Sequence, residues 1–234
     1  MSAKARQLPL TLRWPPRQRF AHFRVAAGNA EALTLAQDLA SRRGAPWVLL
    51  HGPAGCGKTH LLIAACQLAQ AERRSSRYAA AARLTDAEAM RALSGADFLA
   101  LDGLDAVAGN AATEHALFDL YNRLRAAGTT LLMAAREPLK SLPLVLPDLR
   151  SRLGTCVQVS VSPLDEAARR ALVQDWAQER GLALDPPALD WLFARAARDL
   201  HSLQGLFERI DRAALAERRR ITIPFLRTLL AEGD

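Results

Sequence analysis

Long apolar runs are absent from this 234-residue sequence. A membrane-spanning helix needs ~18 or more consecutive apolar residues, and no stretch approaches that length. The first residues include Lys4 and Arg6, but the apolar segment of a secretory signal does not follow them. We therefore expect a cytoplasmic protein with no membrane partner.

Cysteine is also scarce. The three cysteines, Cys56, Cys66 and Cys156, lie far apart in the sequence. Their odd number argues against a disulfide framework, and their spacing matches no zinc site. The sequence has no zinc-finger or recognisable helix-turn-helix pattern, which excludes these common DNA-reading modules. A reducing compartment is the simplest interpretation.

Acidic residues are missing before Glu31, although the whole chain carries a net charge of +7. The basic residues of this first stretch are Lys4, Arg6, Arg13, Arg17, Arg19 and Arg24. A basic segment can contact nucleic acid or an acidic protein. A solvated arginine-rich surface explains the same composition, so a weak DNA contact by this arm stays open.

The central motif that is present is a glycine-rich turn between the apolar segments 47–51 and 61–66, the order strand, turn, helix of a P-loop. Glycines let backbone N–H groups point at phosphate oxygens, and the helix N-terminus adds positive partial charge. Lys58 would reach the β- and γ-phosphates, and the Thr59 hydroxyl would ligate Mg²⁺. The expected nucleotide-binding residues are Gly52, Pro53, Ala54, Gly55, Cys56, Gly57, Lys58, Thr59 and His60.

A second motif is the apolar run 98–101, which ends in Asp102. Ligands of open parallel sheets bind at the carboxyl ends of the strands. Asp102 is therefore the predicted Walker B residue that holds Mg²⁺ through its water shell, and a strand-ending Asp in a turn is the alternative. A vigorous ATPase usually has a second acid at the next position, where this chain has Gly103. Whether Asp105 takes that role is left open, and weak intrinsic hydrolysis is expected.

The hydrophobic pattern predicts an α/β part followed by a small helical part. Strands are expected at 47–51, 77–82, 97–102, 129–134 and 156–161, and helices at 30–42, 59–72, 86–93 and 113–126, the last capped by Thr113. Ser162-Pro163 predicts the start of a helix to Arg180, with further helices at 185–197, 199–218 and 224–230. The expected fold is a five-stranded parallel sheet with flanking helices and an all-helical lid. The expected segments are an arm at 1–19, a nucleotide-binding base at 20–161 and the lid at 162–234.

This order of motifs resembles the AAA+ family. The P-loop with His60, Leu61 and Leu62 is similar to that of the initiator DnaA and its relatives. Phe20 and Phe23 are similar to the region of these proteins that contacts the nucleotide base. The stretches 118–123, 146–153 and 220–225 resemble DnaA-homologous regulators of the Hda group. The resemblance covers nearly the whole chain, which stops after the lid, so a regulator is expected rather than an initiator.

The resemblance implies a negative regulator of replication initiation that binds ADP or ATP with Mg²⁺. Such a protein docks on the DNA-loaded sliding clamp, the β subunit of the DNA polymerase, and stimulates hydrolysis of DnaA-bound ATP, which prevents re-initiation. It would be associated with the nucleoid through the clamp, and homo-oligomerisation is left open. The clamp-binding peptide would be Gln7, Leu8, Pro9 and Leu10. A glutamine and two leucines on an extended backbone suit a groove with an apolar pocket.

Arg152 matches the arginine finger of the family. A guanidinium on the γ-phosphate of a neighbour's ATP stabilises transition-state charge, and such fingers contribute about 10³–10⁵-fold in other NTPases. Arg150 is the rival candidate, although the Ser-Arg-Leu context favours Arg152. A structural arginine paired with Asp148 or with the lid is the other alternative.

Three positions depart from the family pattern. Gly103 replaces the second acid, Ala134–Arg136 stand in place of a polar, acidic sensor 1, and His201 lies where the sensor 2 arginine of the lid would be. Arg198, one turn away, is a substitute for His201. All three departures predict a nucleotide site poorly equipped for its own catalysis, in which bound ADP is a structural ligand that sets the angle between base and lid.

Two other functions are compatible with parts of the sequence. An AAA+ helicase loader or DNA-bound adaptor would use the basic arm on nucleic acid, and its DNA binding would weaken steeply with salt. A P-loop kinase acting on a small molecule would not need the arm peptide, the helical lid or the context of Arg152.

Overall fold

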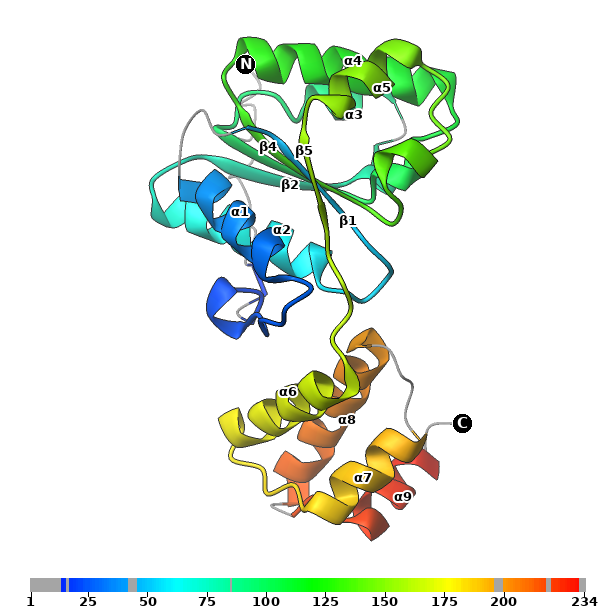
Figure 1. The fold of residues 1–234 in the computed structure, drawn as a ribbon. Coiled ribbons are helices and arrows are strands. Elements are labelled where there is room, and N and C mark those ends of the chain that lie inside the picture. Colours follow the sequence, from blue (N-terminus) through cyan, green and yellow to red (C-terminus); the bar gives the residue numbers. More distant parts are fainter. Residues whose placement is uncertain are drawn as a thin grey trace, which may run out of the picture.

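The computed structural model describes residues 14–15, 17–41, 46–84, 86–195, 200–217 and 220–231. The predicted clamp peptide, 7–10, lies outside the described residues. The chain forms an α/β unit followed by a smaller helical unit (Figure 1).

A parallel sheet of five strands forms the centre of the α/β unit, as the sequence predicts. The strands are β1 (Val48–His51), β2 (Ser76–Ala80), β3 (Phe98–Asp102), β4 (Thr130–Ala135) and β5 (Val157–Ser160). Their order is β2-β3-β4-β1-β5. β4 therefore lies between the strand that leads into the P-loop and the strand that ends in Asp102.

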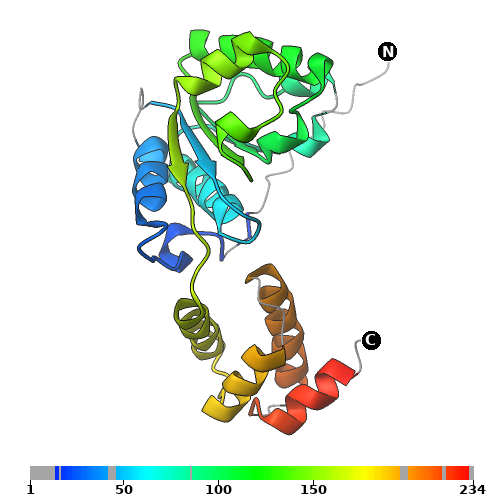
Figure 2. The same ribbon diagram turned by 45° about the vertical axis from the view of Figure 1, so that its right-hand side comes forward.

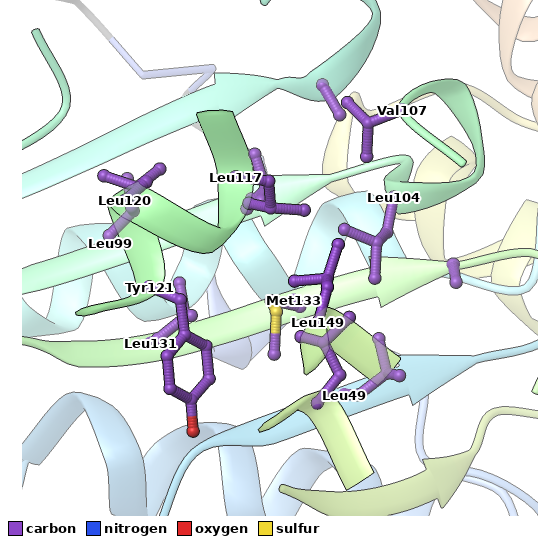
Figure 3. Close-up of a cluster of buried hydrophobic side chains, with 14 of the residues drawn as sticks. Leu49, Leu99, Leu104, Val107, Leu117, Leu120, Tyr121, Leu131, Met133 and Leu149 are labelled. Atoms are coloured by element: carbon purple, nitrogen blue, oxygen red, sulfur yellow. The ribbon is translucent and has the colours of Figure 1, made fainter. Parts of the chain in front are cut away.

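Helices cover both faces of the sheet. α1 (Ala30–Ser41) and α2 (Lys58–Ala71) lie on one face, and α3 (Ala87–Arg91), α4 (Ala111–Ala126) and α5 (Pro147–Gly154) lie on the other (Figure 1). Alternate strand residues supply the two cores: Leu49 and Met133 face α4 and α5, and Leu50 faces α1 and α2. Figure 3 shows the first of these cores. Burial on both faces explains why the central strands β1, β3 and β4 are nearly continuous apolar runs, whereas the edge strands β2 and β5 are partly exposed and contain polar residues.

The lid contains α6 (Glu166–Glu179), α7 (Pro186–Arg195), α8 (Leu200–Glu217) and α9 (Ile223–Ala231). It follows an extended segment after β5 and lies beyond the carboxyl edge of the sheet (Figure 2). Its core includes Val173, Leu192 and Phe207. Four short 3₁₀ helices complete the described secondary structure: Phe20–His22, Ala81–Arg83, Leu104–Ala106 and Leu139–Ser141. Among the described residues, no helix has the length and apolarity to cross a membrane.

The predicted starts of two helices are wrong. α6 begins at Glu166, and the carboxylate of Asp165 caps it by accepting a hydrogen bond from the N–H of Ala168 at 2.7 Å. Ser162 instead donates its N–H to the carbonyl of Gly28 at 2.9 Å, which keeps the connector extended. The cap of α4 is Asn110 rather than Thr113, because its side chain accepts from the N–H of Ala112 and of Thr113. α5 was not predicted, although Pro147 at its first position and Asp148 in its first turn are helix-start signals.

Candidate functional site

A cavity of about 1180 Å³ lies between the P-loop and the lid. The P-loop, the segment before α1, the carboxyl edge of β3 and β4, and helices α6 and α8 all contribute to its lining. Arg17 Nη1 and Gln18 Oε1 at its edge are buried and have no hydrogen-bond partner among the described residues. Unpaired buried polar atoms of both donor and acceptor type suit a polar ligand. The size and lining fit a nucleotide.

The P-loop turns into α2 through Gly57, whose φ of +102° is a conformation that favours glycine. A Cβ on Gly57 would lie 2.9 Å from Cε2 of Phe23, so the residue must also be small. The ring of Phe23 contacts that of His60 edge-on, with centroids 5.4 Å apart. The predicted nucleotide-base region and the predicted phosphate loop thus form one surface. Burial lowers the pKa of His60, which favours the neutral imidazole.

Lys58 lies within the curve of the P-loop. Its ammonium donates hydrogen bonds to the carbonyl oxygens of Gly52 at 2.5 Å and Pro53 at 2.8 Å. Only 9% of the residue is exposed. The cation is therefore held by the carbonyl oxygens of its own loop, and the residue lines the cavity.

Thr59 and Asp102, the two predicted metal residues, are brought together by the sheet. Thr59 Oγ1 donates to Asp102 Oδ2 at 2.6 Å. A hydroxyl and a carboxylate at the cavity are the hard oxygen ligands that Mg²⁺ prefers, so the residues present fit this ion. Tyr78 on β2 donates its phenol to the same Oδ2 at 2.9 Å. No local pattern in the sequence marks Tyr78, because its contact with Asp102 depends on β2 lying next to β3.

No second carboxylate follows Asp102, because the next residue is Gly103, and the nearby Asp105 is bonded to the main chain. Both carboxylate oxygens of Asp105 accept from the N–H of Arg136 at 2.9 Å. The carbonyl of Arg136 in turn accepts from the N–H of Gly52 at 3.2 Å. Asp105 therefore ties the end of β4 in place. The side chain of Arg136 is exposed and lines the cavity, while Ala134 and Ala135 are fully buried.

The lid contacts the base through two exposed polar contacts, one of which is an ion pair between Arg24 and Asp175. Arg24 Nη1 lies 3.0 Å from Asp175 Oδ2, and His22 Nδ1 lies 3.5 Å from Glu179 Oε1. Both acids belong to α6. Arg180, at the end of that helix, stacks its guanidinium on Phe207 at 5.0 Å, and both line the cavity.

The predicted lid sensor, His201, is described only in its backbone. The backbone of His201 belongs to α8, but its side chain lies outside the described residues, as does the whole of Arg198. Within the described part of the lid, Arg180 is a cation that lines the cavity. No pattern in the sequence marks Arg180 as a cavity residue, because its position depends on how α6 faces the base.

Arg152 lies on the exposed side of α5, away from the residues that line the cavity. Among the described residues, no hydrogen bond or ion pair holds its guanidinium, and none joins it to Asp148. Its carbonyl, by contrast, accepts from the hydroxyls of Thr155 at 2.7 Å and Tyr121 at 3.3 Å. Hydrogen bonds therefore fix the backbone of Arg152, while its guanidinium has no hydrogen-bond partner among the described residues.

Arg150, the rival candidate, has a structural role. Its guanidinium donates to the carbonyl oxygens of Leu139, Leu142 and Leu144, at 2.9 to 3.2 Å. These bonds hold the loop before α5 against the helix. The geometry therefore favours Arg152 over Arg150 as a group that could reach a partner.

A buried acid positions α5. Glu114 on α4 is 0% exposed, and its carboxylate accepts from the N–H groups of Gly109, Val145 and Leu146 at 2.7 to 3.0 Å. Leu146 is the N-cap residue of α5. Glu114 thus fixes the start of the helix that carries Arg152.

The sequence and the fold match known proteins. Residues 15–160 match the family model of the bacterial DnaA ATPase domain, and residues 165–230 match that of the Hda lid domain. A protein of Haemophilus influenzae with the description "Uncharacterized protein" is 33% identical over 188 residues, which is 79% of this chain and 81% of that protein.

Solved structures agree on the fold. Domain III of the replication initiation protein DnaA from Thermotoga maritima has a TM-score of 0.80 at 19% identity, over 94% of this chain and 98% of that one. AMPPCP-bound DnaA from Aquifex aeolicus has a TM-score of 0.71 at 23% identity, over 84% and 66%. The RuvB Holliday junction branch migration motor of Thermotoga maritima has a TM-score of 0.69 at 20% identity, over 92% and 71%.

Proposed function

The chain belongs to the Hda and DnaA-related AAA+ proteins, and from that membership we propose that it is a nucleotide-binding regulator that acts on DnaA. It would stimulate hydrolysis of DnaA-bound ATP at the DNA-loaded sliding clamp and so prevent re-initiation. The observation that carries this proposal is the uncommitted guanidinium of Arg152 on a rigidly fixed helix. A lid of the Hda type supports it.

The nucleotide site supports a role in binding rather than in rapid turnover. Lys58 would contact the phosphates, and Thr59 with Asp102 would hold Mg²⁺, which supplies charge neutralisation when bound. Phe23 and His60 would contact the base side of ADP or ATP. Gly103 supplies no carboxylate to orient a water, and Asp105 is engaged with the backbone of Arg136. We expect weak hydrolysis by the protein alone.

The partner's ATP would meet Arg152. A guanidinium brought to a γ-phosphate from a second protein stabilises the charge that develops during phosphoryl transfer. Such a group has to be exposed in the free protein, and Arg152 is exposed. Because Glu114 and Arg150 fix the ends of the preceding loop, little ordering of the backbone is needed when the partner binds.

The clamp would be bound by the peptide 7–10. We further propose that the chain is divided into an arm at 1–19, a base at 20–161 and a lid at 162–234. The protein would be cytoplasmic and would associate with the nucleoid through the clamp. In this arrangement the arm selects the DNA-bound location and the base presents Arg152.

The test is a single-turnover assay of ATP hydrolysis by DnaA with DNA-loaded clamp. The Arg152→Ala variant is expected to lose stimulation by about 10³-fold or down to background. Arg91→Ala, which removes an exposed arginine from α3, is the matched control and should stimulate as the wild type does. Stimulation by Arg152→Ala equal to that of the control would refute the finger.

A second measurement separates the proposal from a helicase loader or adaptor. Clamp binding is measured for the wild type and for Gln7→Ala and Leu10→Ala. Loss of binding in both variants supports docking through the arm. Clamp-independent DNA binding that falls steeply with salt, together with clamp binding that survives both changes, would favour the adaptor instead.

A further inference from the structure

Tyr78 gives the candidate metal carboxylate a second hydrogen-bond donor. Its phenol and the hydroxyl of Thr59 both donate to Oδ2 of Asp102, at 2.9 Å and 2.6 Å. The tyrosine comes from β2, the edge strand next to β3. Burial raises the pKa of the phenol, and the neighbouring Asp102 raises it further, so the group stays a donor at physiological pH.

These two bonds fix the orientation of the carboxylate. An ionised carboxylate oxygen offers about two acceptor positions, and Thr59 and Tyr78 take both of those on Oδ2. Oδ1 is then the oxygen left for a cation or for water bound to it. Thr59 keeps its own lone pairs for a metal, because it uses only its proton in the bond to Asp102. Without Tyr78, one bond would remain and the carboxylate could turn.

The ring of Tyr78 also contacts the described start of the chain. Trp14 packs edge-on against it, with centroids 6.3 Å apart and planes at 88°. The indole N–H of Trp14 donates to Oε1 of Gln70 on α2 at 3.0 Å. Trp14 comes four positions after Leu10, a span of at most about 14 Å of extended chain. A partner that holds 7–10 is thus tethered close to Trp14.

We propose that Tyr78 is a positioning residue for the Mg²⁺-nucleotide site. Because Trp14 packs on Tyr78, the affinity for nucleotide in the presence of Mg²⁺ depends on the position of the N-terminal arm. The first half rests on the nucleotide site, and the last step rests on the proposed function, with the clamp as the partner of the arm. When a partner draws the arm away, Trp14 leaves the ring, Tyr78 is less constrained, and Asp102 loses its fixed orientation.

The first experiment measures the dissociation constant of ADP by calorimetry with Mg²⁺ and again with EDTA. Mg²⁺ is expected to tighten binding in the wild type, and Tyr78→Phe should reduce that tightening about fivefold. Tyr121→Phe is the matched control, because it deletes the hydroxyl of the other tyrosine, which bonds near Arg152. A general loss of stability would weaken both affinities and leave their ratio unchanged. An unchanged ratio in Tyr78→Phe would overturn the positioning role.

The second experiment tests the link to the arm. Trp14→Ala should lower the same ratio by about two- to threefold, and Trp14→Phe, which keeps an aromatic edge, should stay near the wild type. Added clamp should shift the wild-type ratio toward that of Trp14→Ala and leave the variant's ratio unchanged. A clamp that binds but does not shift the ratio would overturn the link. A clamp that fails to bind the wild type would overturn docking alone, since the variants without clamp still test Tyr78 and Trp14.

Discussion

Lys58 in the nucleotide cavity and Arg152 on α5 are both cations suited to phosphate, yet their surroundings are opposite. Lys58 is buried and bonded to two carbonyls of its own loop. Arg152 is exposed, and bonds to its backbone carbonyl fix the main chain while the guanidinium makes none among the described residues. In the proposed function, Lys58 binds the chain's own nucleotide and is held by the fold before the nucleotide binds. Arg152 is proposed to contact a partner's nucleotide, which requires a fixed main chain and a guanidinium free of hydrogen bonds within the described residues.

The largest expected difference between the two cations is in nucleotide affinity, which the Lys58→Ala variant tests. Loss of a charge-assisted bond to phosphate should weaken nucleotide binding on the order of 50-fold, or about 2–3 kcal/mol. Arg152→Ala should leave nucleotide affinity unchanged. Calorimetric titration of both variants with ADP and Mg²⁺ checks the contrast. Equal losses in the two variants would mean that Arg152 serves the chain's own site.

A smaller effect is expected from Glu114→Gln. The amide replaces one acceptor oxygen by a donor, so the N–H of Gly109 or that of Leu146 loses its partner, depending on which oxygen is replaced. We expect the free energy of unfolding in urea to fall by about 2 kcal/mol. Asp119→Asn makes the same chemical change at an exposed position of α4 and should be nearly neutral.

Glu114→Gln also tests whether an effect on α5 can be distinguished from an effect on the nucleotide cavity. If Glu114 positions α5, stimulation of DnaA should fall more than the affinity of the chain for ADP, measured at a temperature where the protein is fully folded. An equal fall in both would assign Glu114 a general structural role.

Local signals explain what could be predicted from the sequence. The P-loop is contiguous, and the strand that ends in Asp102 obeys the rule that parallel strands place their carboxyl ends at one edge, so the contact of Thr59 with Asp102 was foreseeable. The central strands β1, β3 and β4 followed from apolar runs bounded by turns, while the edge strand β2 has a weaker pattern.

The rest depends on how the strands are ordered. Tyr78 reaches Asp102, and Asp105 reaches the N–H of Arg136, because β2, β3 and β4 are neighbours, which no local pattern encodes. The signal Ser162-Pro163 does not start the helix, because Asp165 caps α6 and the N–H of Ser162 pairs with the distant Gly28.

The smallest expected effect concerns the ion pair that joins the base to the lid. Arg24 and Asp175 have side chains that are 41% and 47% exposed, so water screens the pair and its contribution is small. Arg24→Ala should weaken ADP binding by about two- to threefold at low salt, and the difference should vanish at high salt. The exchanged pair, Arg24→Asp with Asp175→Arg, is the control and should recover part of the lost affinity. A loss that the exchange does not recover would mean that Arg24 contacts the nucleotide itself, as Arg152 is proposed to contact the nucleotide of a partner.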